Sequence, residues 1–376
     1  MDRPREGATK ERRYGTSVPR ILYIGGSEAN GLEKRQTLRD LGASLESFDL
    51  QPYLETGSRI FRSIAHRFNV GAPVSRLNRD LLQFVEDLDQ IDLVWVDKGK
   101  WIRPDTLAAI RSRFGATIVH FANDAMLLHN RSRAFIRSIP LYDFHFTTKR
   151  FEVDSYQRAG ARHVRLMPNA IDGGRFRPAS PEESSPFKCD VVFIGRCEPH
   201  YVRCIRAVAR SGVDIRVWGP RWPRYARIHR WARGIVAGNG VWGDDYPRAI
   251  SGARIAIGLL SKRFPETVTT RSIEIPACGT LLLAERTPEH QKLFREGEEA
   301  AFFDSDRELV QKIEYYLEHP DERERLAAAG RLRFLESGYA NIERFRKMLE
   351  EVAEETGRLH FCPSGRILRV DLAVDA

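Results

Sequence analysis

Two glutamates, Glu266 and Glu274, lie in the stretch PETVTTRSIEIPACGT with seven residues between them. Two carboxylates that face one substrate atom can act as an acid/base pair. The spacing argues against this role, because eight residues of α-helix turn through about 800° and leave the two side chains roughly 80° apart. Pro265 and the β-branched residues 267–270 favour instead a loop that carries Glu266 and a helix that carries Glu274.

The start of this expected helix suits an anionic ligand. We expect Thr269 or Thr270 to cap the helix, whose free backbone N–H groups would then attract a diphosphate. Glu274, one turn into the helix, could accept hydrogen bonds from hydroxyl groups of such a ligand. In the alternative interpretation Glu274 is solvated, or it pairs with Arg271 one turn earlier.

Basic residues follow two further apolar runs of strand type. Gly195 and Arg196 end the run CDVVFIGR, where a glycine lets the backbone approach a phosphate and an arginine can clamp it with two hydrogen bonds. Lys262 and Arg263 come shortly after RIAIGLL and can supply more positive charge. The alternative in each case is a solvated side chain. The candidate ligand-binding residues of this half are Gly195, Arg196, Gly219, Lys262, Arg263, Thr269, Thr270, Arg271 and Glu274.

No D-x-D motif, a frequent metal-binding carboxylate pair, lies at an expected strand end. The nearest is DSD at 304–306, which is typical of a helix start with Ser305 or Asp306 as the N-cap. We therefore expect no metal ion and no other cofactor. Arginine, lysine and the helix N-terminus would balance the negative charge of a phosphate-bearing ligand.

The first half of the chain has polar residues after its own strands. His120 ends the run ATIVH, and Asn123 and Asp124 follow in the next loop. We expect His120 to face an open site and Asp124 to orient or deprotonate a hydroxyl group. The alternative for a lone histidine is a structural role. The residues expected to line the site opposite the diphosphate are Gly25, Gly26 and Ser27.

The apolar runs alternate with helical patterns in both halves. The first half has strand-like runs at residues 20–26, 43–50, 92–98, 116–122 and 144–149. After residue 187 the pattern restarts with CDVVFIG, VDIRVWG, RIAIGLL and TLLLAE. Such alternation predicts parallel sheets covered by helices on both faces, with ligands beyond the carboxyl ends of the strands.

We therefore predict an α/β protein of two Rossmann-like domains that face a central cleft. The expected divisions are a flexible tail (1–19), a first domain (20–170), a linker (171–186), a second domain (187–340), and a C-terminal helix and tail (341–376).

The composition limits the class of protein. Lys and Arg number 60 against 51 Asp and Glu in 376 residues, a formal net charge of +9 that favours anionic partners. The five cysteines form no C-x-x-C pair, which argues against a disulfide framework or a zinc site.

The charged N-terminus lacks the apolar core of a secretory signal, and no apolar run is long enough to span a bilayer. We expect a cytoplasmic location.

The segment RWPRYARIHRWARG at 221–234 has an arginine at every third position. On one continuous helix, each step of three residues drifts by about 60°, so the arginines would not share a face. The segment is either a solvated positive stretch or a surface for an acidic acceptor or a membrane. Peripheral contact with the inner face of a membrane is left open.

Taken in order, these motifs resemble the glycosyltransferases of the GT-B fold, and more closely the CgeB-like, spore-maturation-type group related to the retaining E-x7-E family. The similar residues are the glycine turn after the first strand, MPNAIDGGRFRP, VVFIGR and RSIEIPACGTLLLAERTPEHQKLFREGEEAAFF. The resemblance covers about residues 20–350. The G-F-G that the family carries after the first glutamate is replaced by Thr267, Val268 and Thr269.

The resemblance implies a nucleotide-sugar donor in the second domain and an acceptor of unknown identity in the first. Glu274 would contact the ribose, and Glu266 and His120 the donor sugar, so the candidate catalytic residues are Glu266, His120 and Asp124. The implied reaction moves a hexosyl or related sugar with retention and without metal.

Two alternatives stay open. A sugar-nucleotide epimerase or hydrolase could use the same fold. A non-catalytic protein could bind nucleic acid or anionic lipid, although the sequence has no motif that reads nucleic acid, so we expect no nucleic-acid partner.

Overall fold

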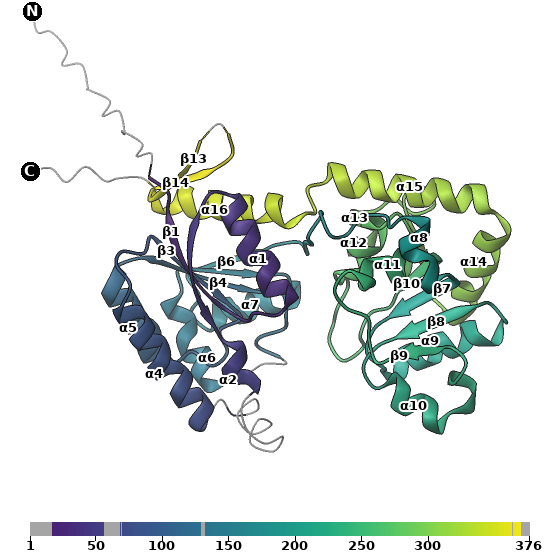
Figure 1. Ribbon diagram of the computed structural model, residues 1–376, viewed down its shortest axis with the longest axis horizontal. Coiled ribbons are helices and arrows are strands. Elements are labelled where there is room, and N and C mark those ends of the chain that lie inside the picture. The colour runs from purple at the N-terminus through teal and green to yellow at the C-terminus, as the bar shows by residue number, and fades with distance from the viewer. Residues whose placement is uncertain (1–16, 56–67, 69, 129–131, 363, 370–376) are drawn as a thin grey trace, which may run out of the picture. The chain divides into compact units, whose positions relative to one another are not determined.

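The computed structural model describes residues 17–55, 68, 70–128, 132–362 and 364–369 (Figure 1). The chain forms two compact units. Unit 1 comprises residues 1–167 and 345–376, and unit 2 comprises residues 168–344. Most of the tail predicted at 1–19, and residues 370–376, lie outside the described residues.

Unit 1 is built on a parallel sheet of six strands in the order β2-β1-β3-β4-β5-β6. The strands are β1 Arg20–Gly25, β2 Ser44–Asp49, β3 Leu93–Asp97, β4 Thr117–Ala122, β5 Phe144–Thr147 and β6 His163–Leu166. Every residue of β3 and β4 is buried, because helices cover both faces of the sheet. The predicted parallel sheet of the first half is confirmed.

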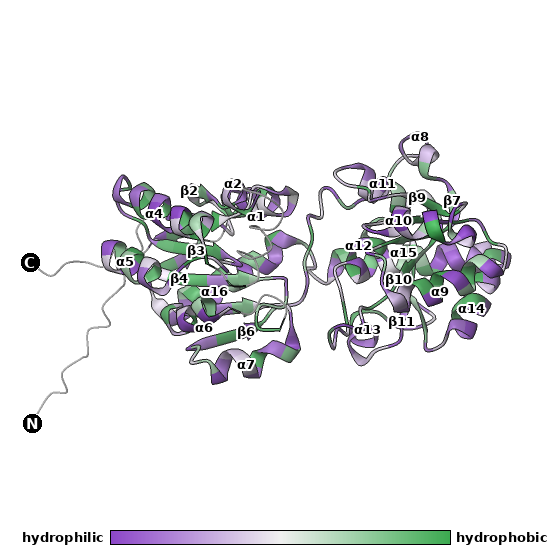
Figure 2. Cartoon of the chain, turned by 90° about the horizontal axis from the view of Figure 1, so that it is seen from below, coloured by the Kyte–Doolittle hydropathy of each residue, from purple (hydrophilic) through white to green (hydrophobic). Residues whose placement is uncertain are grey.

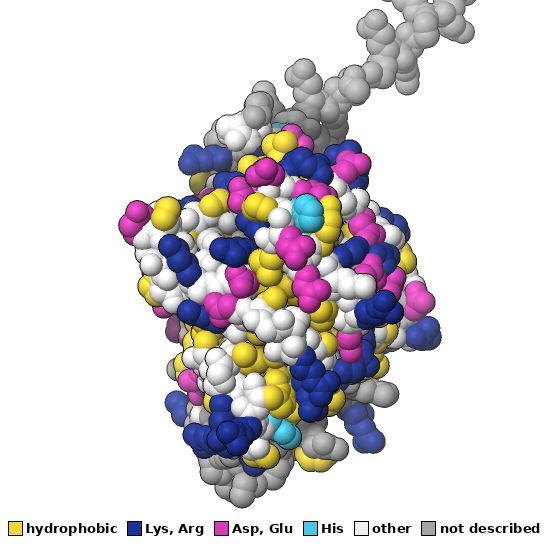
Figure 3. All heavy atoms as spheres, turned by 90° about the vertical axis from the view of Figure 1, so that its right-hand side faces the viewer, with side chains coloured by type: hydrophobic (Ala, Val, Ile, Leu, Met, Phe, Trp, Pro, Cys, Tyr) yellow, Lys and Arg dark blue, Asp and Glu magenta, His cyan; other side chains and the backbone are white. Residues whose placement is uncertain are grey.

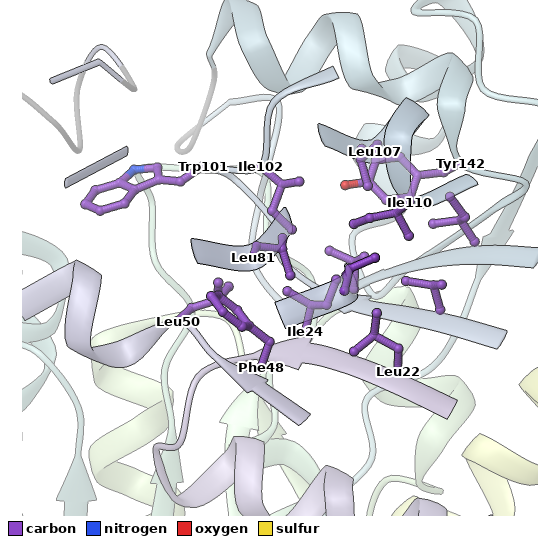
Figure 4. Close-up of a cluster of buried hydrophobic side chains, with 14 of the residues drawn as sticks. Leu22, Ile24, Phe48, Leu50, Leu81, Trp101, Ile102, Leu107, Ile110 and Tyr142 are labelled. Atoms are coloured by element: carbon purple, nitrogen blue, oxygen red, sulfur yellow. The ribbon is translucent and has the colours of Figure 1, made fainter. Parts of the chain in front are cut away.

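Helices α4 Ala72–Glu86 and α5 Pro104–Phe114 cover one face of this sheet, and α1 Ala29–Asp40 and α16 Asn341–Thr356 cover the other (Figure 1). Large apolar side chains fill the space under α4 and α5 (Figure 4); they include Leu22, Ile24, Phe48, Leu50, Leu81, Trp101, Ile102, Leu107, Ile110 and Tyr142. The smaller elements are α2 Gln51–Glu55, α6 Arg133–Ser138, η1 Ile139–Leu141, η2 Arg150–Glu152 and α7 Val153–Arg158.

The C-terminal segment completes unit 1. Phe345 of α16 is 1% exposed, and its ring centroid lies 4.9 Å from that of Trp95 and 5.7 Å from that of Phe121. After α16, the antiparallel strands β13 Leu359–Phe361 and β14 Ile367–Arg369 form a hairpin, and the Ile367 N–H donates to the Leu41 carbonyl at 2.8 Å. Of the segment predicted as a C-terminal helix and tail, residues 345–362 and 364–369 therefore pack as part of unit 1.

Unit 2 repeats the architecture with the strand order β12-β11-β10-β7-β8-β9, all parallel. Its strands are β7 Cys189–Ile194, β8 Ile215–Trp218, β9 Val236–Gly238, β10 Ala253–Gly258, β11 Leu281–Glu285 and β12 Ala301–Phe303. Its helical elements are α8 Pro181–Ser184, η3 Ser185–Phe187, α9 Pro199–Arg210, α10 Trp222–Ile228, η4 Arg230–Ala232, α11 Asp245–Ser251, α12 Arg271–Ala277, α13 Pro288–Leu293, α14 Asp306–Glu318 and α15 Pro320–Glu336.

Two apolar layers cover the faces of the second sheet. On one face α9 and α14 pack through residues such as Ile205 and Leu309, and on the other face α12 packs through Ile273 and Ile275. In Figure 2 the strands of both units carry mainly the hydrophobic colour, while the outer sides of the helices are hydrophilic. The helix start predicted at Ser305 is confirmed, since its hydroxyl accepts a hydrogen bond from the Glu308 N–H at 3.2 Å.

The segment predicted as a linker, 171–186, lies within unit 2. Ile171 and Phe176 are each 4% exposed and pack in the same apolar layer as Ile273. Ser180 and Glu183 form a capping box at the start of α8. The sequence did not predict that this segment packs on unit 2, because two isolated apolar residues in a turn-rich stretch show no periodicity.

Candidate active site

Basic residues follow three neighbouring strands of unit 2 at the carboxyl edge of its sheet. The strands β10, β7 and β8 are adjacent and parallel, so their carboxyl ends meet at one edge. We call the following side chains the basic edge: Arg196 after β7, Arg221 after β8, Lys262 and Arg263 after β10, and Arg271 at the start of α12. Four of these were predicted, and Arg221 was missed.

Two glycines shape the backbone at this edge. A Cβ on Gly219 would lie 1.9 Å from the Gly195 carbonyl oxygen, and Gly219 has φ of 149°. The Gly195 N–H donates to the Trp218 carbonyl at 2.9 Å, and the Trp222 indole N–H donates to the Gly195 carbonyl at 2.9 Å. The Gly195–Arg196 turn therefore lies directly against the backbone at Gly219, and only a glycine fits there.

Arg221 was missed because its strand end looked like an ordinary basic loop. Its φ is 75°, which is unusual for a residue with a side chain. Together with Pro220, it turns the chain sharply from β8 into α10. The available signal was the glycine–proline–arginine sequence directly after an apolar run.

A carboxylate that was not predicted, Glu285, fixes the end of β10. Its Oε1 accepts from the Leu260 N–H at 2.7 Å and lies 2.9 Å from His200 Nε2, and its Oε2 pairs with the Lys262 ammonium. Burial opposes its ionisation, but hydrogen bonds from Lys262, Leu260 and His200 lower the pKa of Glu285 overall. Lys262 is therefore a positioned ammonium group rather than a freely solvated one. The signal was an apolar strand that ends in glutamate, LLLAE.

The structure places Glu266 in the loop before α12 and Glu274 inside that helix, which begins at Arg271. This confirms the predicted division into loop and helix. Thr270 occupies the N-cap position, as one of the two predicted candidates, but its side chain accepts no capping hydrogen bond. The Thr270 side chain bonds instead to the Glu274 carboxylate, and the Thr269 N–H donates to Ser272 Oγ at 3.3 Å.

Glu274 is largely buried, at 8% exposure. The Tyr246 hydroxyl donates to its Oε2 at 2.6 Å. Burial raises the pKa of Glu274, against the opposing effects of the Tyr246 and Thr270 hydrogen bonds and the nearby Arg271 charge. Arg271 itself donates to the Leu259 carbonyl at 2.8 Å, so it ties α12 to the end of β10. The solvated alternative for Glu274 is thus wrong.

A second hydrogen-bonded chain holds α12 on β11. His290 Nδ1 lies 2.6 Å from the Glu285 carbonyl oxygen, which can only accept, so Nδ1 carries the proton. His290 Nε2 then accepts from the Ser272 hydroxyl at 2.7 Å. Burial lowers the pKa of His290, which keeps the ring neutral and suits this arrangement.

Unit 1 has a pocket of about 310 Å³ at the carboxyl ends of β1, β3 and β4. Lys34 and Asp97 pair at its floor at 2.7 Å, and both are 7% exposed or less. At the rim, Lys98 Nζ lies 2.8 Å from Asp124 Oδ2. Burial opposes ionisation of Asp124, but Lys98 lowers its pKa overall, so Asp124 is a paired carboxylate.

Among the predicted residues of the first half, Gly26 and Asp124 line this pocket, and Asn123 does so too. Gly25 and Ser27 lie outside its lining. A Cβ on Gly25 would lie 2.6 Å from the Tyr23 ring, so Gly25 serves the packing under β1.

His120 does not face an open site, and that prediction is wrong. The ring is fully buried, with Nε2 3.0 Å from the Lys98 carbonyl oxygen and Nδ1 3.2 Å from His145 Nδ1. Burial and the neighbouring His145 lower the pKa of His120 well below its usual value. The reason is its strand: β4 is central, so its side chains point into the helical layers rather than beyond the sheet's edge.

Solved structures of similar architecture cover nearly the whole chain. HepE from Anabaena, in complex with UDP-glucose, matches 89% of this chain and 99% of its own, with a TM-score of 0.62 and 14% identity. Sucrose-phosphate synthase from Thermosynechococcus elongatus matches 90% and 99%, with a TM-score of 0.61 and 14% identity. The fold is GT-B.

This fold also occurs with another chemistry. A UDP-N-acetylglucosamine 2-epimerase matches 91% of this chain and 97% of its own, with a TM-score of 0.56 and 12% identity. At such identities the likeness establishes the GT-B fold alone. No curated protein is significantly similar to the chain in sequence.

Most of unit 2 resembles a known protein family. Residues 200–350 match a family described as glycosyl transferase-like. The matched range contains Arg221, Lys262, Arg263 and both glutamates of the E-x7-E stretch. The match bears out the prediction of a glycosyltransferase at the level of the enzyme class.

The described residues contain no group of three or more histidine, cysteine, aspartate or glutamate side chains that could hold a metal ion. None of their helices combines the length and the apolar character needed to cross a bilayer.

Proposed function

We propose that the GT-B protein transfers a sugar from a nucleotide-sugar donor held at the carboxyl edge of the unit 2 sheet. The basic edge is the observation that carries this proposal: each of three adjacent strands is followed by a loop that carries arginine or lysine, and two glycines let the backbone approach closely. Guanidinium and ammonium groups form charge-assisted hydrogen bonds with phosphate oxygens, which suits a diphosphate. The family match over residues 200–350 supports the same reading.

The two glutamates would then hold the rest of the donor. Tyr246 and Thr270 orient the Glu274 carboxylate, and we assign that carboxylate to the ribose hydroxyls. We assign Glu266, in the loop before α12, to the hydroxyls of the donor sugar. Both roles rest on the resemblance to the E-x7-E family.

We further propose a retaining transfer in which no enzyme carboxylate acts as a nucleophile. Charge on the leaving diphosphate would be stabilised by Arg196, Arg263 and the Glu285-bound Lys262, without a metal ion. Within the fold, the sequence motifs favour the CgeB-like group.

The acceptor would bind in unit 1, and its identity is open. The pocket that contains Asp124 offers a carboxylate held by Lys98 and a wall with Leu50, Leu77 and Met126. Because Lys98 keeps Asp124 ionised, that carboxylate can orient an acceptor hydroxyl by accepting its hydrogen bond.

A donor panel tests the proposal. The purified protein should release sugar from one nucleotide sugar among UDP-, GDP-, dTDP- and ADP-linked donors, and the matching nucleotide should raise its unfolding temperature. Glu274→Ala should weaken nucleotide binding by about tenfold to a hundredfold, the usual effect of a lost hydrogen bond to a charged group. An unchanged nucleotide affinity would show that the ribose assignment of Glu274 is wrong.

The epimerase alternative has one specific support, the fold likeness to a UDP-N-acetylglucosamine 2-epimerase. The same panel separates the two chemistries. An epimerase returns a nucleotide sugar with an inverted ring carbon, which NMR spectroscopy detects, whereas a transferase without acceptor slowly gives free sugar and nucleotide.

A further inference from the structure

The chain between Asp214 and Asp244 is strongly basic. Residues 215–243 contain six arginines and no aspartate or glutamate. They form β8, α10, η4 and β9 at one side of unit 2. Figure 3, which views the side at the right of Figure 1, shows Lys and Arg side chains gathered at its lower end, where Figure 1 places α10.

Helix α10 has a buried face and an opposite basic face. Trp222 and Ala226 are 0% and 8% exposed. Arg224, Arg227 and Ile228 lie within an arc of about 100° on the other side of this helix, and Ile228 is 73% exposed. The drift calculated for one continuous helix does not apply to all five arginines, because α10 ends at Ile228.

The residues after α10 are fixed against it. Arg233 donates to the carbonyl oxygens of Ala226 at 3.3 Å and Arg227 at 3.0 Å. The His229 ring stacks on the Tyr225 ring at 3.9 Å. Arg230, exposed between these anchors, therefore keeps a defined place beside α10. We call the exposed set Arg224, Arg227, Ile228 and Arg230 the α10 patch.

The charges of the α10 patch are uncompensated. Within the described parts of the chain, none of its three arginines forms an ion pair with a carboxylate. Other exposed arginines of unit 2 do: Arg203 pairs with Asp306 at 2.8 Å, and Arg254 with Asp190 at 2.8 Å. Three neighbouring positive charges without an internal partner suit an external anionic surface.

We propose that the α10 patch docks unit 2 on an anionic lipid bilayer. The guanidinium groups would bind lipid phosphates bidentately, and Ile228 between them would enter the boundary between head groups and acyl chains. The patch thus combines an exposed aliphatic side chain with flanking arginines, and both kinds of group favour the surface of an anionic bilayer.

The same features disfavour a nucleic-acid surface. Stacking on bases needs exposed aromatic rings. Trp222 is fully buried, and the half-buried rings of Tyr225 and Trp231 pack edge-on at 6.0 Å. The exposed His229 ring is already stacked on Tyr225, and the exposed Trp242 lies after β9, outside the α10 patch. Binding to the phosphates of a nucleic acid would leave the exposed Ile228 side chain without an apolar partner.

Vesicle sedimentation of the full-length protein tests the proposal. Wild type should bind vesicles of phosphatidylglycerol and phosphatidylcholine, bind pure phosphatidylcholine far less, and detach as salt rises. The variant R224E/R227E/R230E should bind the anionic vesicles at least about 100-fold more weakly. Ile228→Ser should lower binding by about tenfold without changing the charge.

The matched control is K292E/R307E/R325E, which makes the same charge change at exposed positions on α13, α14 and α15. It should keep most of the vesicle binding if the α10 patch, and not the net charge, is responsible. All variants should keep the wild-type unfolding temperature, because the replaced side chains are exposed.

The proposal fails if wild type ignores anionic vesicles, if the control variant loses as much binding as the α10 variant, or if single-stranded RNA displaces the protein from vesicles. The outcome does not depend on glycosyl transfer, because vesicle binding is measured without donor or acceptor.

Discussion

At the scale of single residues, Gly219 is a position of the basic edge where a side chain does not fit. A methyl group there would lie 1.9 Å from the Gly195 carbonyl oxygen, and the φ of 149° disfavours any side chain. Gly219→Ala should therefore shift the Gly195–Arg196 turn, lower nucleotide binding at least about tenfold, and destabilise unit 2 by about 1–3 kcal/mol.

Gly234→Ala is the matched control for this prediction, since a Cβ at Gly234 meets nothing within 4 Å. Denaturant unfolding and nucleotide titration of both variants give the comparison. Equal effects of the two substitutions would contradict the close approach of the two turns.

Residue identities in the site were partly readable from the sequence. Arg196, Lys262 and Arg263 were found because each follows an apolar run that ends a strand. The partners that hold these side chains in place could not be predicted from the sequence. Glu285 pairs with Lys262 only because β10 and β11 are neighbours in the sheet. His120 was misjudged for the same reason, because its burial depends on His145 from the next strand.

At the scale of elements, Arg286 after β11 connects that strand to α14. It binds Glu296 at 2.7 Å and Glu308 at 2.8 Å, and Lys312 also pairs with Glu296 at 3.0 Å. The hydrogen bonds from Arg286 lower the pKa of Glu296 and of Glu308 to about 2.

A carboxyl group with a lowered pKa in the folded state stabilises the protein above its unfolded pKa, and this stabilisation is lost as the pH falls. The free energy of unfolding should therefore decline between about pH 4.5 and pH 2 in wild type. In Arg286→Met this decline should be smaller. Arg254→Met, which removes only the exposed pair with Asp190, should keep the wild-type profile. Identical profiles for wild type and Arg286→Met would contradict the account.

The elements themselves were mostly predictable. Runs such as LVWV and TIVHFA are buried on both faces of a parallel sheet, so their apolar character is continuous. Strand β9 was missed because it is three residues long and partly exposed. The start of α12 at Thr270 was predicted, but the capping hydrogen bond is absent because the Thr270 hydroxyl bonds to the Glu274 carboxylate.

At the scale of the whole chain, the sequence of the C-terminal segment did not predict that this segment packs on unit 1. The periodicity of α16 shows an apolar face but does not say which sheet it covers. Phe345→Ala should open a cavity against Trp95 and Phe121 and cost about 3–5 kcal/mol.

Hydrogen–deuterium exchange can locate the effect of Phe345→Ala. Exchange should rise in α16, β3 and β4, while the strands of unit 2 stay at the wild-type level. Glu354→Ala, at an exposed position of the same helix, is the control. A rise confined to unit 2 would show that α16 does not stabilise the first sheet.

The central claim is that the carboxyl edge of the unit 2 sheet binds the diphosphate of a nucleotide sugar. Calorimetric titration with UDP, GDP, dTDP and ADP tests it most directly, using wild type, R196A/R263A and the control R254A, which removes an arginine at the amino end of β10. One nucleotide should bind wild type and R254A alike, and should bind R196A/R263A at least about tenfold more weakly. Equal affinity of all three proteins, or no binding of any nucleotide by wild type, would contradict it.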